Sequence, residues 1–258
     1  MQYQFISVER EGQLMIVTLQ RPEAHNALNF GAHEELQHAF DSFAHDDDQW
    51  VAILTGSGTK AFCAGHDLKQ QANDANLTTP SKGFGGLASR FDLNKPVIAA
   101  VNGVAMGGGF ELALACDIIV ASANASFALP EAKVGLAALA GGMQRLPQLV
   151  GLKRGMGMLL TGRRVSASEG VEYGFVNEVT EGDVLTLAKK WAAEILACSP
   201  LSVRATKEAV LKGVDVPVQQ ALVEQWEYPQ VRTMLTSQDA VEGPKAFAEK
   251  RKPIWVGY

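Results

Sequence analysis

Two glutamates stand in apolar surroundings, where a carboxyl group is costly unless it is paired or used. Glu111 lies within the apolar run Phe110 to Ala115, and Glu131 follows Pro130 after another apolar stretch. Burial would raise the pKa of either carboxyl group toward values that suit acid or base catalysis. One such glutamate would more often cap or salt-bridge the end of an element. Two of them beside glycine-rich segments favour general acid–base chemistry.

Two glycine-rich segments could offer backbone N–H groups to an anion. The first, Ala61 to Leu68, directly follows a predicted strand, and the second, Asn102 to Glu111, contains the triplet Gly107 to Gly109. Glycines that begin a helix after a strand leave N–H groups free for an anion or a developing oxyanion. Close packing of a helix on a strand explains such glycines about equally well. Neither the GxGxxG dinucleotide pattern nor a GxxxxGK(S/T) phosphate loop occurs.

The histidines and cysteines indicate no metal centre. The histidines of one predicted helix and its end are His33, His38 and His45. They lack the i, i+4 spacing of a helical zinc motif, so we expect them to be solvated and expect no bound metal. The cysteines are Cys63, Cys116 and Cys198. With no CxxC pair among them, they are expected to be reduced and structural, and no GxSxG pattern signals a serine nucleophile.

The elements that must position these residues alternate between strand and helix. Short β-branched and apolar runs predict the strands Phe5–Val8, Leu14–Leu19, Val51–Thr55, Pro96–Val101 and Asp117–Ala121. The first two surround a Glu11-Gly12 turn, which indicates a hairpin. Helical spacing predicts helices over residues 30–46 and 107–116. This alternation favours an α/β core with buried parallel strands.

The remaining chain is a polar loop and a helical third. Residues 70–86 are rich in Asn, Thr, Ser, Gly and Gln and are expected to form a mobile loop near the ligand. Four helices are predicted after Val176, at Asp183–Ala197, Leu201–Lys212, Val218–Met234 and Gln238–Lys250. They could cover the core or contact another subunit. We therefore divide the chain into an α/β core, residues 1–195, and a helical oligomerisation region, residues 196–258.

Composition narrows the class of protein. The chain has 258 residues, 47% of them hydrophobic, and its 23 Lys and Arg against 28 Asp and Glu give a net charge of −5. These values are typical of a globular protein without a nucleic-acid partner, since phosphate contacts need a basic surface. The longest uncharged run, Pro96 to Phe110, is shorter than a membrane span. Met1 to Leu19 has no secretory signal pattern, so we expect a cytoplasmic protein.

Motifs along nearly the whole chain resemble those of the crotonase, or enoyl-CoA hydratase/isomerase, superfamily. They are RPEAHNALN at residues 21–29, AFCAGHDL at 61–68, KPVIAAVNG at 95–103, GGGFE at 107–111, Pro130-Glu131, LTGR at 160–163 and FAEKR at 247–251. The resemblance implies a crotonase-like (ClpP/crotonase) spiral of repeated β-β-α units with a C-terminal helical trimerisation region. It further implies an acyl-CoA substrate, no cofactor other than the coenzyme A of that substrate, and a homotrimer or a dimer of trimers.

The same resemblance implies roles for individual residues. The N–H groups of Ala64 and Gly108 would hold the thioester oxygen, while Glu111 and Glu131 would activate water and move a proton at C2. Both glutamates together are the main argument for hydration. The other residues expected to line the substrate are Ala24, Leu28, Gly65, His66, Asp67, Leu68, Gly107, Leu139 and Lys250. Either Lys60 or Lys250 could meet the CoA phosphates.

Two departures from the family pattern affect these expectations. His66 replaces a small residue and could contact the ligand or close the loop. The run Ala137 to Ala140 replaces a Pro-Gly turn before Gly141-Gly142. Leu139 cannot adopt a positive φ as easily as glycine, which puts the water-positioning N–H in doubt.

Several activities fit the motifs. The leading hypothesis is a 2-enoyl-CoA hydratase, a lyase of fatty acid metabolism. The alternatives within the superfamily are carnitinyl-CoA-type dehydration, Δ3-Δ2 double-bond isomerisation and thioester hydrolysis. An RNA-binding member is disfavoured because no Lys or Arg lies between Pro22 and Thr59. A non-catalytic interaction protein is disfavoured by the two glutamates.

Overall fold

A large twisted sheet forms the centre of the protein, for which a computed structural model describes residues 2–67 and 81–258. The strand order is β1-β2-β3-β5-β7-β10. These strands are β1 (Ile6–Glu11), β2 (Leu14–Leu19), β3 (Val51–Gly56), β5 (Val97–Val101), β7 (Ile118–Ser122) and β10 (Glu178–Thr180). Only the β1–β2 pair is antiparallel, and every other neighbouring pair runs parallel.

A second, smaller sheet has the order β4-β6-β8-β9. Its strands are β4 (Ala61–Cys63), β6 (Val104–Met106), β8 (Ser126–Ala128) and β9 (Val165–Ser166). Successive strands alternate between the sheets, because β3, β5 and β7 join the large one while β4, β6 and β8 join the small one. Helix α3 (Gly108–Leu114) completes the unit that begins with β5 and β6. This alternation confirms the predicted β-β-α spiral.

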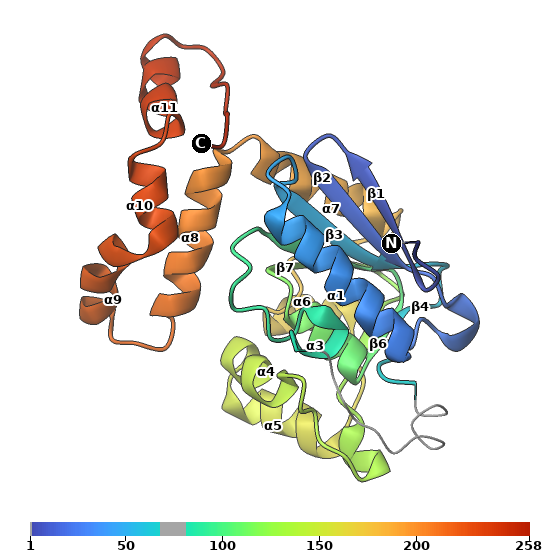
Figure 1. Ribbon diagram of the computed structural model, residues 1–258. Helices are drawn as coiled ribbons and strands as arrows, with labels where there is room; N and C mark the ends of the chain where they lie inside the picture. Colours follow the sequence, from blue (N-terminus) through green and yellow to red (C-terminus); the bar gives the residue numbers. More distant parts are fainter. Residues whose placement is uncertain (1, 68–80) are drawn as a thin grey trace.

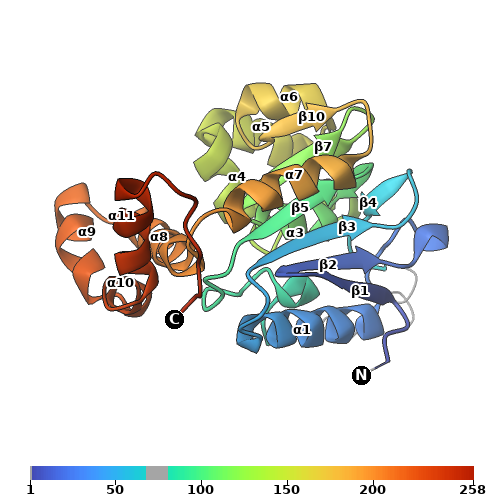
Figure 2. The ribbon, with the colours of Figure 1, turned by 90° about the horizontal axis from the view of Figure 1, so that it is seen from above.

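Each face of the large sheet is covered by a helix (Figure 2). Alternate side chains of β2 divide between the faces, with Met15 and Val17 in one core cluster and Leu14 and Ile16 in the other. Helix α1 (Phe30–His45) buries Leu36, Phe40 and Phe43 in the first cluster. Helix α7 (Val184–Leu196) buries Val184, Ala188 and Ala192 in the second. The parallel strands are therefore buried on both faces.

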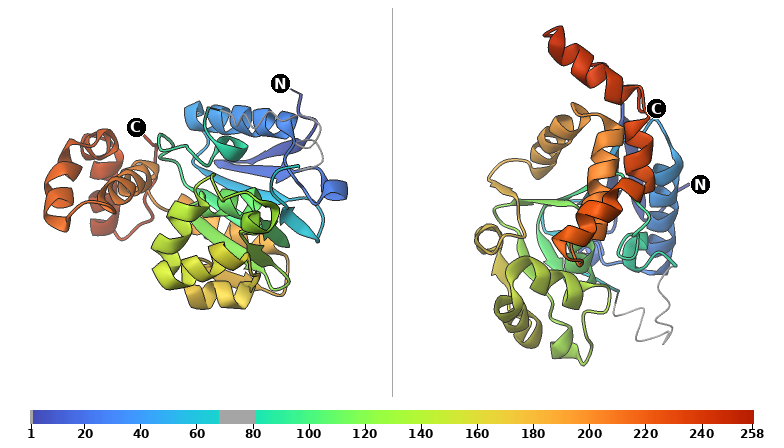
Figure 3. Two further views of the ribbon diagram at one scale, coloured as in Figure 1. Left: turned by 90° about the horizontal axis from the view of Figure 1, so that it is seen from below. Right: turned by 90° about the vertical axis from the view of Figure 1, so that its left-hand side faces the viewer.

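The other helices form two groups. Beside the core lie η1 (Pro22–Ala24), η2 (Phe84–Gly86), η3 (Glu131–Val134), α4 (Gly142–Val150), α5 (Leu152–Thr161) and α6 (Ala167–Tyr173). The C-terminal group comprises α8 (Pro200–Gly213), α9 (Val218–Glu224), η4 (Gln225–Glu227), α10 (Pro229–Leu235) and α11 (Asp239–Ala248). This second group stands beside the core rather than over the sheet, as Figures 1 and 3 show.

Most predicted elements are confirmed, with corrections near the C-terminus. The hairpin and the strands near residues 51, 97 and 118 lie where the sequence places them. The single helix predicted over Val218–Met234 is wrong, since Pro229 begins a new helix after a 3₁₀ turn. Strand β10 lies in a region where little β structure was expected. Among the described residues, no helix has the length and apolarity required to span a bilayer.

Candidate functional site

The segment after β4 places one unused backbone N–H beside the start of α3. The N–H of Ala64 donates to the carbonyl oxygen of His25 at 3.0 Å, so it is already engaged. Leu28 forms a parallel bridge with His66, using the carbonyl of Gly65 and the N–H of Asp67. The His66 N–H has no partner among the residues that the structure describes. The structure therefore corrects the assignment of Ala64: the free donor of this segment is the N–H of His66.

The second donor is at the beginning of α3. The Gly108 N–H belongs to the first helical turn, whose N–H groups have no intrahelical acceptor, and it donates to no group among the described residues. A Cβ built on Gly65 would lie 3.1 Å from the Gly108 nitrogen. The chain that carries the His66 N–H thus passes against the Gly108 N–H. Two free donors on adjoining segments can stabilise negative charge on one carbonyl oxygen.

Glycine is required at this junction for two reasons. Gly65 has a φ of +94°, and any Cβ there would lie 2.8 Å from the Met106 carbonyl oxygen. A Cβ on Gly109 would lie 2.0 Å from the carbonyl oxygen of Cys63, which is closer than real Cβ atoms approach. Helix α3 therefore packs directly on the backbone of β4. Close packing and free N–H groups, which the sequence could not separate, are both present here.

Glu111 projects from the first turn of α3 and is 3% exposed. Its Oε1 accepts a hydrogen bond from the backbone N–H of Gly142 at 2.9 Å, which joins α3 to the start of α4. The pKa of Glu111 is raised to about 7, chiefly by burial and also by the nearby charge of Glu131, while the backbone hydrogen bonds from Gly142 and Ala140 oppose the shift. At neutral pH this carboxyl group can therefore either donate or accept a proton.

Glu131 begins η3 and faces the same region. Its Oε1 lies 3.0 Å from the position that a Cβ on Gly107 would occupy, so the carboxylate rests over the turn that leads into α3. Its Oε2 is buried and has no hydrogen-bond partner among the described residues. Burial raises the pKa of Glu131. Glu131 lies over the Gly107 turn that begins α3, the helix that carries Glu111, and the charge of Glu131 is among the causes that raise the pKa of Glu111.

Leu139 stands in the run that replaces the Pro-Gly turn of the family pattern. Its φ is not positive, and its N–H donates to the carbonyl oxygen of Ala137 at 2.9 Å. That N–H is therefore occupied and does not point freely at a water between the glutamates. The side chain is 79% exposed. The Gly142 N–H donates to Glu111, and Ala140 of the same turn also contributes a backbone hydrogen bond to this carboxyl group.

The aromatic ring of Phe84 forms a wall of the site. A Cβ on Gly108 would lie 2.4 Å from this ring, so the ring rests on the backbone that carries the second donor. The Gly85 N–H donates to Nδ1 of His33 at 3.0 Å. Phe84 and Gly85 both belong to η2, at the end of the polar loop. Residues 70–80 of that predicted mobile loop lie outside the described part of the chain, whereas η2 is held in place.

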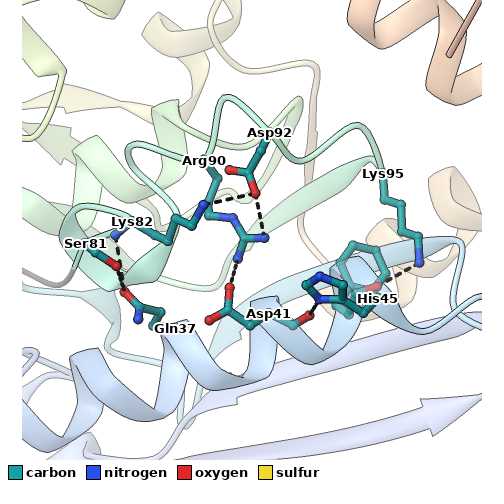
Figure 4. Close-up of polar contacts among 9 residues, drawn as sticks. Gln37, Asp41, His45, Ser81, Lys82, Arg90, Asp92 and Lys95 are labelled. Atoms are coloured by element: carbon teal, nitrogen blue, oxygen red, sulfur yellow. Dashed lines mark hydrogen bonds and ion pairs between the residues drawn. The ribbon is translucent and has the colours of Figure 1, made fainter. Parts of the chain in front are cut away.

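Polar contacts hold the segment around η2 against α1 (Figure 4). Arg90, whose side chain is 2% exposed, bridges Asp41 of α1 at 2.8 Å and Asp92 at 3.2 Å. The Lys82 backbone N–H donates to Oε1 of Gln37. At the far end, Lys95 donates to two carbonyl oxygens at the end of α1, 2.8 and 2.6 Å away. The segment that carries Phe84 is thus fixed along the length of α1.

The other predicted substrate residues have different placements. Ala24 is half-buried in η1, and the Leu28 side chain is 1% exposed in the core, while the Leu28 backbone forms the bridge with His66. Asp67 pairs with Arg21 at 2.9 Å. Leu68 lies outside the described residues.

The two lysines considered for the CoA phosphates lie far apart in the fold. Lys60 is exposed just before β4. Lys250 follows α11, which stands apart from α3 in the views of Figures 1 and 2, so one chain does not bring Lys250 to the site.

One expectation about histidines is wrong. His38 and His45 are exposed, as predicted, but His33 is 2% exposed and sits against His66 and Phe84. Its spacing from Leu36 and Phe40 follows the buried face of α1, and this signal could have placed it inside. Phe84 and Gly142 were also missed, because their roles depend on which segments meet in three dimensions. Cys63 is buried, which raises its thiol pKa to about 12, and Cys198 is exposed.

Comparison with known proteins extends this description. The family model described as Enoyl-CoA hydratase/isomerase matches residues 9–257. A carnitinyl-CoA dehydratase from Salmonella enteritidis PT4 is 44% identical over 259 residues, covering 98% of both chains. The solved enoyl-CoA hydratase from Mycobacterium tuberculosis H37Rv superposes with a TM-score of 0.92 at 40% identity, covering 98% of this chain and 99% of that one. The enoyl-CoA hydratase from Bacillus anthracis gives a TM-score of 0.90 at 37% identity over 99% and 100% of the two chains.

Proposed function

Because the chain belongs to the enoyl-CoA hydratase/isomerase family, we propose that it is a lyase that adds water to, or removes it from, the C2–C3 bond of an acyl-CoA thioester. The observation that supports this reaction most is the pair of Glu111, which is buried, and Glu131, which is partly buried with an enclosed Oε2, both with raised pKa values. Hydration needs one group to take a proton from water and a proton source for C2. A pair of carboxyl groups supplies both.

The thioester oxygen would accept hydrogen bonds from the N–H groups of His66 and Gly108. As water attacks C3, negative charge moves from the double bond to this oxygen, and fixed donors stabilise that charged state more than the ground state. Glu111 and Glu131 would hold the water and exchange its proton with C2. In the reverse direction the same groups would remove the C2 proton and protonate the leaving hydroxyl group.

For the acyl group we propose two candidates of the same reaction class. The first is an unsubstituted 2-enoyl-CoA, supported by structural relatives that are enoyl-CoA hydratases. The second is the carnitinyl group, supported by the full-length curated relatives at 43–44% identity, which are carnitinyl-CoA dehydratases. In both cases hydration places a hydroxyl group at C3, and dehydration removes it and forms the C2–C3 double bond. They differ at C4, where the carnitinyl chain carries a quaternary ammonium group.

A panel of CoA esters with product identification tests this proposal. Crotonyl-CoA, longer and branched enoyl-CoAs, crotonobetainyl-CoA and carnitinyl-CoA are each incubated with the protein, and products are identified by mass. Addition or loss of water with any of these esters supports the proposed reaction, and the relative kcat/KM values select the acyl group. Release of free CoA, or a shift of the double bond without a gain or loss of water, would contradict hydration and indicate another reaction of the family.

We also propose that the chain assembles as a trimer, or as a dimer of trimers, through its C-terminal helices. These helices carry exposed apolar side chains, including Val214, Val218, Val223, Trp226 and Phe247, each more than half exposed in the single chain. A second copy of the chain would remove such surface from water. Sedimentation of the purified protein tests this, and a monomer at micromolar concentration would contradict it.

A further inference from the structure

A pair of histidines joins the segment that carries the His66 N–H to the protein interior. Nε2 of His33 lies 3.4 Å from Nδ1 of His66, and the two rings stack with centroids 5.6 Å apart. His33 is 2% exposed on the inner face of α1, whereas His66 is only partly buried. Among the described residues, the backbone of His66 is tied to its surroundings by its bridge with Leu28. The side-chain contact adds to the Leu28 bridge and to the Arg21–Asp67 ion pair in fixing this segment.

The Gly85 hydrogen bond determines which ring nitrogens of His33 and His66 are donors and which are acceptors. The Gly85 N–H donates to Nδ1 of His33, so a neutral His33 carries its proton on Nε2. That proton is then donated to Nδ1 of His66. Burial lowers the pKa of His33 to about 4, and burial also lowers the pKa of His66 despite the opposing charge of Asp67. Both rings are neutral near pH 7, and the chain of donors runs from Gly85 through His33 to His66.

The same cluster also contacts the segment of the second donor. The rings of Phe84 and His33 meet edge to face, with centroids 4.6 Å apart and an interplanar angle of 83°. Phe84 also packs against the backbone of Gly108. His33 therefore touches the two side chains that adjoin the two free N–H donors. A shift of His33 would change the relative position of both donors.

We propose that His33 is a positioning residue, which holds the His66 and Gly108 N–H groups in register through its contacts with His66 and Phe84. This inference rests on the proposed function, because it concerns how the thioester oxygen is polarised. His33 itself does not touch the substrate. Its loss would leave substrate affinity largely intact and lower the stabilisation of the charged oxygen, since that stabilisation depends on donor placement.

The test compares three variants with the wild-type chain. His33→Leu removes both hydrogen bonds, whereas His33→Gln keeps an acceptor for Gly85 and a donor for His66. His45→Leu, at the exposed end of the same helix, is the matched control. Each protein is assayed for kcat and KM with its best acyl-CoA. Each is also titrated with a chromophoric 3-aryl-2-enoyl-CoA, whose absorbance moves to longer wavelength when the carbonyl group is polarised.

We expect His33→Leu to lower kcat by about 10- to 100-fold with little change in KM, and to reduce the absorbance shift of the bound chromophore. His33→Gln should restore both, and His45→Leu should match the wild type. An unchanged kcat and absorbance shift in a folded His33→Leu protein would overturn the inference. So would a His33→Gln protein that is folded and as impaired as His33→Leu.

If His33→Leu does not fold, His66→Leu provides the second route. That variant keeps the backbone N–H and loses only the side-chain contact, so the same loss of kcat and absorbance shift is expected. A normal His66→Leu protein would overturn the inference. A wild-type protein that neither binds nor converts any acyl-CoA would instead remove the proposed function, and this result is distinguishable because it appears without any substitution.

Discussion

Oε1 of Glu111 accepts a hydrogen bond from the backbone N–H of Gly142, 2.9 Å away. This contact joins the first turn of α3, which also presents the Gly108 N–H, to the first turn of α4. It fixes one carboxylate oxygen of a group that is 3% exposed. The Glu111 carboxyl group is thus held at a set position relative to the Gly108 N–H, which we propose binds the thioester oxygen. Such preorganisation matters most for a reaction whose charge develops only in the transition state.

Replacing either carboxyl group by its amide should abolish most activity. Glu111→Gln and Glu131→Gln each remove proton transfer while keeping size, so kcat should fall by about 10²- to 10⁴-fold with little change in ester binding. The assay follows the enoyl-thioester absorbance, and binding is measured by calorimetry. Glu172→Gln, an exposed glutamate of α6, serves as the control. Activity of Glu111→Gln or Glu131→Gln within a few-fold of the control would remove the pair from the mechanism.

The same substitution at Glu111 should stabilise the protein at alkaline pH. Burial raises the folded-state pKa of this group to about 7 from an ordinary value of 4.5. The folded protein therefore keeps a proton that the unfolded chain has lost, and the contribution to stability is full below about pH 4.5 and declines as the pH rises through 7. Relative to wild type, Glu111→Gln should gain on the order of 1–3 kcal/mol between pH 5 and 8. Denaturant titrations at the two pH values measure this gain, and a constant difference would contradict the shift.

Two glycine-to-alanine substitutions should have opposite effects. Gly65 has a φ of +94° and would place a Cβ 2.8 Å from a backbone oxygen, so Gly65→Ala should cost about 1–3 kcal/mol of unfolding free energy and lower kcat. Gly157, within α5, has open space around it and an ordinary φ. Gly157→Ala should stabilise by roughly 0.5–1 kcal/mol and leave kcat unchanged. Thermal unfolding and steady-state kinetics check both, and equal effects would contradict the packing described for Gly65.

Arg90 should contribute more to the unfolding free energy than Lys82, although both side chains pair with Asp92. Arg90→Met leaves Asp41 and Asp92 without the buried guanidinium and should lower the unfolding free energy by about 1–3 kcal/mol. Because the segment carries Phe84 to the site, KM or kcat should also change. Lys82→Met removes a partly exposed pair with Asp92 and should cost less than about 1 kcal/mol. A smaller effect of Arg90→Met than of Lys82→Met would show that the segment is held by other contacts.

The sequence predicts the strands and helices around the site better than it predicts which backbone N–H groups are free there. Apolar alternation and helical spacing are local properties, and they place β3, β5, α1 and the start of α3 correctly. Which N–H is free in the oxyanion segment depends instead on a bridge between Leu28 and His66, 38 residues apart in the chain. Successive N–H groups of an extended segment point in opposite directions, so the register decides between neighbours. No local pattern fixes that register.

The contacts of the His33–His66 pair are a second feature that the sequence does not predict. His33 lies on the apolar face of α1, so its burial could be predicted from spacing, but its partners could not. Gly85 reaches it from the end of a polar loop, and His66 reaches it from the segment after β4. Each of these contacts depends on how the two sheets bring distant segments together. Glu111 and Glu131 are easier to predict, because a carboxyl group within an apolar run can be recognised from the sequence alone.

The most direct test of the proposed reaction follows an oxygen atom. The enoyl-CoA ester with the fastest turnover is incubated with the protein in water labelled with the heavy oxygen isotope, and the product is analysed by mass and fragmentation. We expect a 3-hydroxyacyl-CoA that carries the label on C3, formed by the wild type and the Glu172→Gln control and nearly absent with Glu131→Gln. Label in the carboxylate of a free acid, or an unlabelled isomer of the substrate, would contradict hydration at C2–C3.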